Sequence, residues 1–109
     1  MIFVTGGAFQ GKYDFVKNDL CVADEDIWKD FHEYIDKTGD DDAVLKAVDE
    51  WIGDHKNGAI ICDEVGSGIV PVDIRTRDLR DSIGMISIML AKRADAVYRV
   101  VCGIGTRIK

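Results

Sequence analysis

Consecutive apolar residues and helically spaced apolar residues alternate along this chain. An unbroken apolar run, typical of a strand covered on both faces of a sheet, lies at residues 59–62, and the largely apolar stretches 2–5 and 96–102 are also predicted to be strands. Apolar positions recurring every three to four residues predict amphipathic helices, whose approximate ranges are 27–35, 44–52 and 73–92. Strands alternating with helices predict an α/β fold with a mainly parallel sheet and right-handed crossovers.

The segments between these elements give weaker signals. A helix is expected over about 11–18, a short strand at 20–23, and an edge strand at 106–108 after a turn at 103–105. The acidic triplet Asp24-Glu25-Asp26 is typical of a helix N-terminus, and residues 65–71 read as a loop. The stretch 83–90 is apolar almost all round, which predicts a helix buried on more than one side. That pattern favours a homo-oligomer, although a buried helix in a monomer would have the same pattern.

Composition narrows the class of protein. The 109 residues form one expected domain, 1–109, and a net charge of −6 argues against a general nucleic-acid binder. No apolar run approaches the roughly 18–20 residues of a membrane span, and no basic region precedes the first apolar run, so a cytoplasmic location is expected. The three cysteines lack metal-binding or redox spacing and are expected to be reduced, buried apolar residues.

The candidate chemistry begins directly after the first strand. Residues Gly6 to Lys12 match G-x-x-x-x-G-K between a strand and a helix, the position that a phosphate-binding loop requires. Glycines let backbone amides point inward, the helix start favours phosphate, and Lys12 supplies a charge for the terminal phosphates. The predicted nucleotide-binding residues are Gly6, Gly7, Ala8, Phe9, Gln10, Gly11, Lys12 and Tyr13.

Two features leave this prediction open. Tyr13 stands where such loops have a serine or threonine that holds Mg²⁺, so metal coordination from this position is in doubt. Glycine-rich turns of this kind also occur without any ligand.

A second candidate site follows the apolar run at 59–62. Asp63 could hold Mg²⁺ and Glu64 could orient a nucleophile or a second ligand, as acidic residues at strand ends do in nucleotide-binding enzymes. The candidate catalytic residues are therefore Lys12, Asp63 and Glu64, with Asp63 as the candidate metal ligand. The alternative is that the two acidic residues simply end a strand.

Two blocks of the sequence resemble a known family. Thr5 to Ala8, followed by Gly11-Lys12, resembles the phosphate loop of the bifunctional adenosylcobinamide kinase / adenosylcobinamide-phosphate guanylyltransferase family. Residues Glu64 to Pro71 (E-V-G-S-G-I-V-P) resemble that family's hallmark segment, and the similarity continues in one register from Asp63 to Lys109.

The resemblance implies a P-loop NTPase-like three-layer domain that binds GTP or ATP, with Mg²⁺. It also implies phosphorylation of adenosylcobinamide, then transfer of GMP through a guanylylated histidine, on the way to cobalamin. A homo-oligomer and no nucleic-acid partner are further expectations.

The departures from the family pattern are equally specific. Family enzymes are longer, mainly between the two blocks, so this chain resembles a shortened and divergent member. Met85 and Ile88 stand where the family has polar residues, and His32 and His55 are interpreted as ordinary helix histidines. Two functions remain open: a nucleotide-dependent kinase or nucleotidyltransferase, and a catalytically reduced nucleotide-binding or partner subunit without transferase activity.

Overall fold

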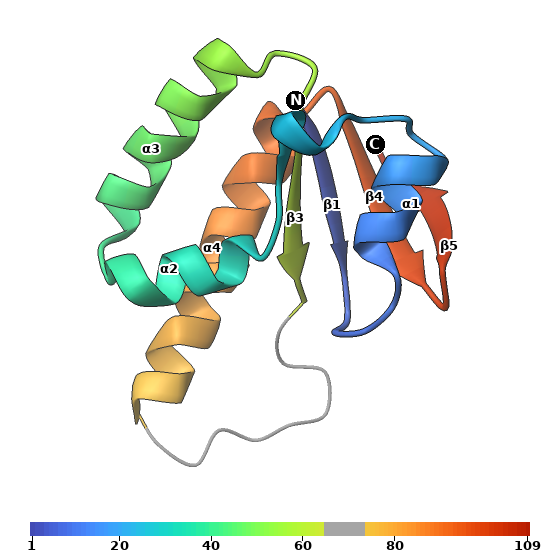
Figure 1. The fold of residues 1–109 in the computed structure, drawn as a ribbon. Helices are drawn as coiled ribbons and strands as arrows, with labels where there is room; N and C mark the ends of the chain where they lie inside the picture. The colour runs from blue at the N-terminus through green and yellow to red at the C-terminus, as the bar shows by residue number, and fades with distance from the viewer. Residues whose placement is uncertain (65–73) are drawn as a thin grey trace.

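A five-stranded sheet with the order β2-β3-β1-β4-β5 forms the centre of the protein (Figure 1). The structure, a computed structural model, describes residues 1–64 and 74–109. The strands are β1 (Ile2–Gly6), β2 (Ile27–Trp28), β3 (Ala59–Asp63), β4 (Ala96–Val101) and β5 (Ile104–Arg107). The first four strands pair in parallel, and β5 pairs antiparallel to β4, so the expectation of a mainly parallel sheet is confirmed.

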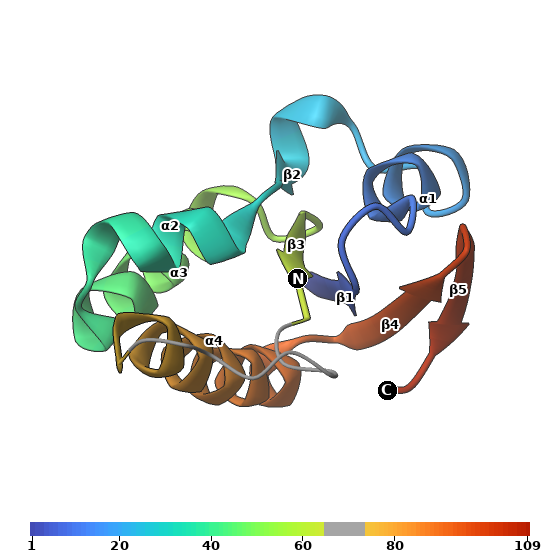
Figure 2. The same cartoon turned by 90° about the horizontal axis from the view of Figure 1, so that it is seen from below.

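Helices cover both faces of the sheet. They are α1 (Lys12–Asn18), α2 (Phe31–Thr38), α3 (Asp41–Asp54) and α4 (Ile74–Arg93), with a 3-10 turn η1 (Asp24–Asp26) before β2. Figure 2 shows α1 on one side of the sheet, with α2, α3 and α4 on the other. The three-layer α/β architecture is therefore confirmed, while the loop expected at 65–71 lies outside the described residues.

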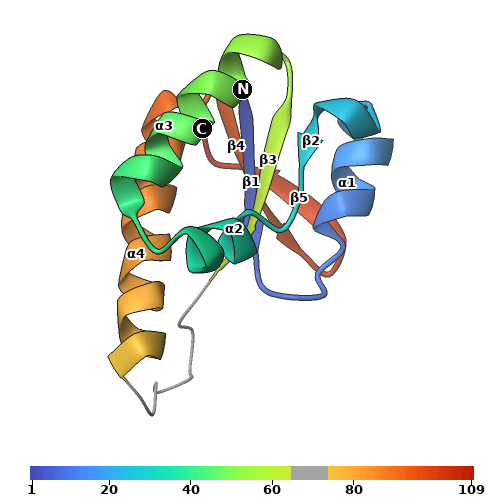
Figure 3. The ribbon, with the colours of Figure 1, turned by 60° about the vertical axis from the view of Figure 1, so that its left-hand side comes forward.

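The segment between α1 and α2 corrects two expectations. Residues 20–23 form no strand, and the strand β2 comes later, at Ile27–Trp28. The helix expected from residue 27 begins only at Phe31, because Ile27 and Trp28 pair with Ala59 and Ile60 of β3 instead. Figure 3 shows the consequence: α2 lies at the same end of the sheet as the connection from β1 to α1.

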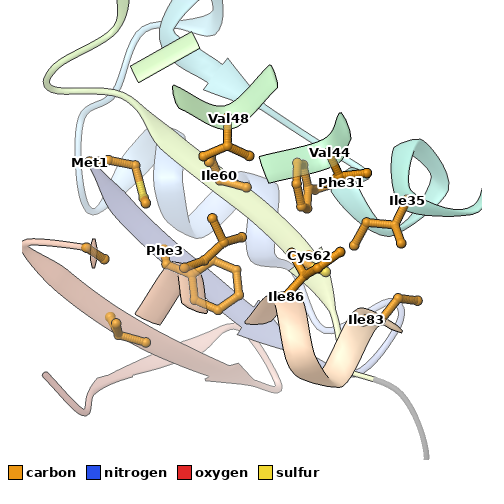
Figure 4. Packing of buried hydrophobic residues seen from close by; sticks show 13 residues of the cluster. Met1, Phe3, Phe31, Ile35, Val44, Val48, Ile60, Cys62, Ile83 and Ile86 are labelled. Carbon is orange, nitrogen blue, oxygen red and sulfur yellow. The ribbon is translucent and has the colours of Figure 1, made fainter. Parts of the chain in front are cut away.

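Alternation along the strands divides the core into two clusters, because successive side chains of a strand point to opposite faces. Phe3, Ile60 and Cys62 pack against the helices α2, α3 and α4 in the larger cluster (Figure 4). Val4 and Ile61 pack against α1 in the smaller one. The apolar stripe predicted for 44–52 is confirmed, since its residues Val44 and Val48 are buried in the larger cluster.

Helix α4 differs from its sequence expectation. Ile83, Ile86 and Leu90 are buried, but Met85 and Ile88 are exposed, as is the neighbouring Met89. The helix therefore has one buried face and one exposed apolar face, and the prediction of burial on more than one side is wrong for this chain by itself. Apolar residues occur on several sides of α4, but the sheet can cover only one side of a helix, so the others remain exposed.

The cysteines also divide. Cys62 is buried, and its burial raises the pKa of the thiol to about 12, which makes it an inert apolar residue. Cys21 and Cys102 are exposed, so the expectation that all three are buried is wrong for these two. In residues 1–64 and 74–109, no helix combines the length and apolar character needed to cross a bilayer.

Candidate functional site

The loop between β1 and α1 depends on two glycines. Gly6 has φ +154°, and a Cβ there would come within 3.0 Å of the Val100 carbonyl oxygen on the neighbouring strand β4. Gly11 has φ +83° and is the N-cap residue directly before α1. Residues with a Cβ rarely adopt such conformations, so the glycines of the motif are required by the path of the backbone.

Hydrogen bonds anchor this loop on both sides. The Glu64 amide donates to the Gly6 carbonyl at 2.7 Å, which joins the loop to the end of β3. The Gly103 amide donates to the Gln10 carbonyl at 2.8 Å, and the Cys102 amide donates to the Gln10 side-chain oxygen at 2.7 Å. The turn between β4 and β5 therefore supports the loop from the side opposite to β3.

Lys12 is the charged residue of the loop, and it is buried. Its side chain is 6% exposed, and its Nζ donates to the Gly7 carbonyl at 2.6 Å. The same nitrogen lies 2.7 Å from Oδ1 of Asp63 at the end of β3. A buried ammonium group needs such partners, because burial without them is strongly unfavourable. The structure therefore brings together two of the three predicted catalytic residues.

A histidine from α2 completes this cluster. The Asp63 amide donates to Nδ1 of His32 at 3.2 Å, and Nε2 of the same ring lies 3.5 Å from Oδ2 of Asp63. Because Nδ1 accepts a hydrogen bond, the proton of a neutral ring is assigned to Nε2. Both nitrogens of His32 thus face Asp63 and hold its position.

The sequence reasoning missed His32 because it missed β2. In a parallel sheet, residues that follow neighbouring strands meet at the carboxyl edge, so a strand at 27–28 beside β3 places the start of α2 next to Asp63. His55, in contrast, stacks on Trp51 with ring centroids 4.4 Å apart and contacts the Trp51 carbonyl at 2.9 Å. Its described contacts are with Trp51, at the end of α3.

A cavity of about 440 Å³ opens over the loop. Its walls come from the loop, the start of α1, the end of β3 and the start of α2. The lining residues are Ala8, Phe9, Gln10, Gly11, Lys12, Tyr13, Asp14, Lys29, Asp30, His32, Glu33, Ile61 and Asp63. Six of the eight predicted nucleotide-binding residues are among them, whereas Gly6 and Gly7 belong to the supporting backbone.

Glu64 does not reach this cavity. Arg99 of β4 holds its carboxylate by two contacts, from Nε at 2.7 Å and from Nη2 at 3.1 Å. The structure therefore places the Glu64 side chain in a bidentate ion pair with Arg99, outside the cavity that Lys12 and Asp63 line, and its part in the chemistry stays a prediction.

Tyr13 directs its hydroxyl away from any position beside Lys12. The phenol donates to Asp24 of η1, and this hydrogen bond raises the pKa of Tyr13 above its ordinary value. Lys17 also pairs with Asp24, at 2.9 Å, and Lys29 lies 5.4 Å from the centre of the Tyr13 ring. Tyr13 thus connects α1 to η1.

Asp63 is the acidic residue beside Lys12 that could hold a metal, in a cavity that Asp14, Asp30 and Glu33 also line. Within residues 1–64 and 74–109, no three His, Cys, Asp or Glu side chains converge as a metal cluster. Magnesium, however, is commonly held by one or two carboxylates together with the phosphates of its nucleotide. The single carboxylate of Asp63 fits a magnesium ion shared with nucleotide phosphates, and it does not fit a metal held by protein ligands alone.

Comparisons with known proteins agree with the resemblance in the sequence. A family model described as cobinamide kinase / cobinamide phosphate guanyltransferase matches residues 15–108, a range that begins after the Gly6–Lys12 loop. The bifunctional adenosylcobalamin biosynthesis protein CobU is 46% identical over 50 residues in Salmonella typhimurium and 44% identical over 50 residues in Escherichia coli. In both comparisons the matched segment is 46% of this chain and 28% of the relative, so the match spans less than a third of those proteins. Because the family model covers most of the chain, this protein belongs to the cobinamide kinase / cobinamide phosphate guanyltransferase family.

Proposed function

We propose that this chain binds GTP or ATP at the Gly6–Lys12 loop and transfers the terminal phosphate to a cobinamide in cobalamin biosynthesis. In that step the acceptor hydroxyl oxygen bonds to the terminal phosphorus, the bond to the nucleoside diphosphate breaks, and the hydroxyl proton is released. Phosphoryl transfer depends mainly on positioning and charge, which a small domain can supply.

The buried Lys12 carries this proposal. Its ammonium group lies in the wall of a cavity of about 440 Å³, among the residues of a glycine-dependent loop. A lysine that served only the fold would be expected at the surface, because lysines are rarely fully buried. A terminal phosphate in the cavity would replace the Gly7 carbonyl and Asp63 as the partner of Nζ.

Magnesium has a defined place in the proposal. Asp63 would hold the ion together with phosphate oxygens, and His32 would keep the Asp63 carboxylate in position. When bound, the ion would neutralise charge on the transferred phosphate. Tyr13 is not proposed as a ligand, because its hydroxyl is engaged by Asp24.

Titration calorimetry with GTP and ATP, with and without Mg²⁺, tests the proposal. We expect micromolar binding that strengthens at least tenfold with Mg²⁺ in the wild-type protein, and an Asp63→Asn variant that loses most of that strengthening. Asp49→Asn, an exposed carboxylate on α3, is the matched control and should bind as the wild type does. Absence of binding by the wild-type protein would overturn the proposed function.

The alternative function is a catalytically reduced nucleotide-binding or partner subunit. The contacts of His32 favour it over the histidine-dependent transferase step, since both ring nitrogens are already engaged by Asp63. Nucleotide binding without phosphorylation of adenosylcobinamide would support this alternative. Phosphorylation detected by mass spectrometry of the corrinoid would support the kinase.

We also propose that the chain forms a homo-oligomer through the exposed apolar face of α4. Met85, Ile88 and Met89 are exposed on this helix, and Ile88 lines a shallow hollow together with the exposed Ile108. Contiguous exposed apolar residues of this kind mark interaction surfaces, and a second copy of the chain offers the same surface in return.

A charged residue in this face should dissociate the oligomer. We expect Ile88→Asp to shift the mass measured by light scattering toward the monomer at micromolar concentration, with unchanged helix content. Ala43→Asp adds the same charge to an exposed position of α3 and should leave the mass unchanged. A wild-type protein that is monomeric at that concentration would contradict this proposal.

A further inference from the structure

Phe9 is a large apolar residue that combines exposure to solvent with an unfavourable backbone conformation. Its side chain is fully exposed, and its φ is +59°, in the left-handed region. For a bulky side chain this backbone conformation is a genuine outlier, since glycine, asparagine and aspartate adopt it far more readily. Phe9 therefore gains nothing from burial in the protein and lies in an unfavourable conformation.

The surrounding loop holds Phe9 in this conformation. On one side, the Gly7 carbonyl accepts a hydrogen bond from Lys12. On the other, Gln10 is bonded through both its carbonyl and its side chain to the turn between β4 and β5. Strained residues that persist because their surroundings fix them are concentrated at functional sites. Phe9 lines the same cavity as Lys12. Contact with a ligand in that cavity would explain why a strained phenylalanine is retained at this position.

The position of Phe9 in the loop indicates which ligand it meets. Loops of this type bind phosphates through their amides, with the lysine at the terminal phosphates. A nucleobase is separated from the terminal phosphate by two further phosphates and a ribose, so the neighbour of a residue in the middle of the loop is the molecule that receives the phosphate. An exposed benzyl side chain offers that acceptor apolar contact.

We infer that Phe9 is the residue that recognises the acceptor, through an apolar face of the acceptor that lies beside its reacting hydroxyl. The inference rests on the proposed function for the identity of the phosphate site. It adds a specificity determinant that the loop pattern does not contain, and it separates acceptor recognition (Phe9) from nucleotide recognition (Lys12).

Two variants of Phe9 test this inference, with adenosylcobinamide as the probe, an alcohol attached to a large corrin ring. Phe9→Asn suits the left-handed conformation and removes the apolar surface, whereas Phe9→Leu keeps an apolar side chain. Nucleotide binding and adenosylcobinamide binding are measured separately for each protein. Ile104→Asn is the control, because Ile104 is also exposed but does not line the cavity.

We expect Phe9→Asn to bind adenosylcobinamide at least about tenfold more weakly, a loss consistent with removing one apolar contact. Its nucleotide affinity should stay within about twofold of the wild type, and its Tm should rise by about 4 °C as the strain is relieved. Phe9→Leu should retain most of the acceptor affinity.

Three results would overturn the inference: unchanged adenosylcobinamide binding by Phe9→Asn, an equal loss of nucleotide binding in that variant, or no adenosylcobinamide binding by the wild-type protein. A wild-type protein that binds adenosylcobinamide but no nucleotide would instead overturn the proposed function.

Discussion

A Lys12→Met variant is expected to bind GTP and ATP at least about a hundredfold more weakly than the wild-type protein. A hydrogen bond between a charged donor and a charged acceptor contributes roughly 1.5–3 kcal/mol, which is about one to two orders of magnitude in affinity. In the wild-type protein the Asp63 carboxylate lies 2.7 Å from Nζ of Lys12, and loss of Lys12 leaves this carboxylate without its cation. That carboxylate would then repel an incoming phosphate.

The measurement is a fluorescence or calorimetric titration, with circular dichroism to confirm the fold. We expect the fold to persist, because the side chain of Asp63 is 26% exposed and water can hydrate it. Lys46→Met, on the exposed surface of α3, is the matched control and should retain the wild-type affinity. Binding by Lys12→Met within about threefold of the wild type would show that the nucleotide does not use this loop.

A Gly6→Ala variant is expected to lose about 3 kcal/mol of its free energy of unfolding. The added methyl group would overlap the Val100 carbonyl oxygen, and φ at this residue is +154°. Backbone strain and forced overlap each contribute on the order of 1–3 kcal/mol. The clash involves backbone on both sides, so no rotation of a side chain can relieve it.

Urea unfolding followed by circular dichroism measures this loss as a lower midpoint at an unchanged slope. Gly53→Ala is the control, because nothing lies within 4 Å of a Cβ at Gly53 and the residue belongs to α3. In a helix, alanine is favoured over glycine by up to about 1 kcal/mol, so this variant should be more stable than the wild type. Equal midpoints for Gly6→Ala and the wild type would contradict the geometry of the loop.

Long elements with strong periodicity were predictable from the sequence. The strands β1, β3 and β4 and the helix α4 lie within one residue of their expected bounds, and α3 contains the expected stripe 44–52 but begins earlier, at Asp41. Their signals are local, since an apolar run or a helical stripe is determined by residues adjacent in the chain. The capping of α3 is similarly local, since the Asp40 side chain accepts from the amides of Asp42 and Ala43.

Elements that depend on a distant partner were not predictable. The strand β2 has only two residues, Ile27 and Trp28, and it exists because β3 supplies a parallel edge for it. Three acidic residues before it suggested a helix start, but they form the 3-10 turn η1 instead. Because the strand was expected at 20–23, the position of His32 beside Asp63 could not be predicted. That position follows from the pairing of β2 with β3.

The sequence by itself determined the family, the α/β class and the glycine-rich loop between the first strand and the first helix. All of these are expressed in short stretches of residues whose spacing carries the information. Only the tertiary structure decided which candidates meet: Lys12, Asp63 and His32 share one cavity, whereas Arg99 holds Glu64 outside it. It also decided that α4 has an exposed apolar face and that Phe9 is strained and exposed. These outcomes depend on which strands lie side by side and how much surface the sheet can cover, and neither quantity is local to any segment of the chain.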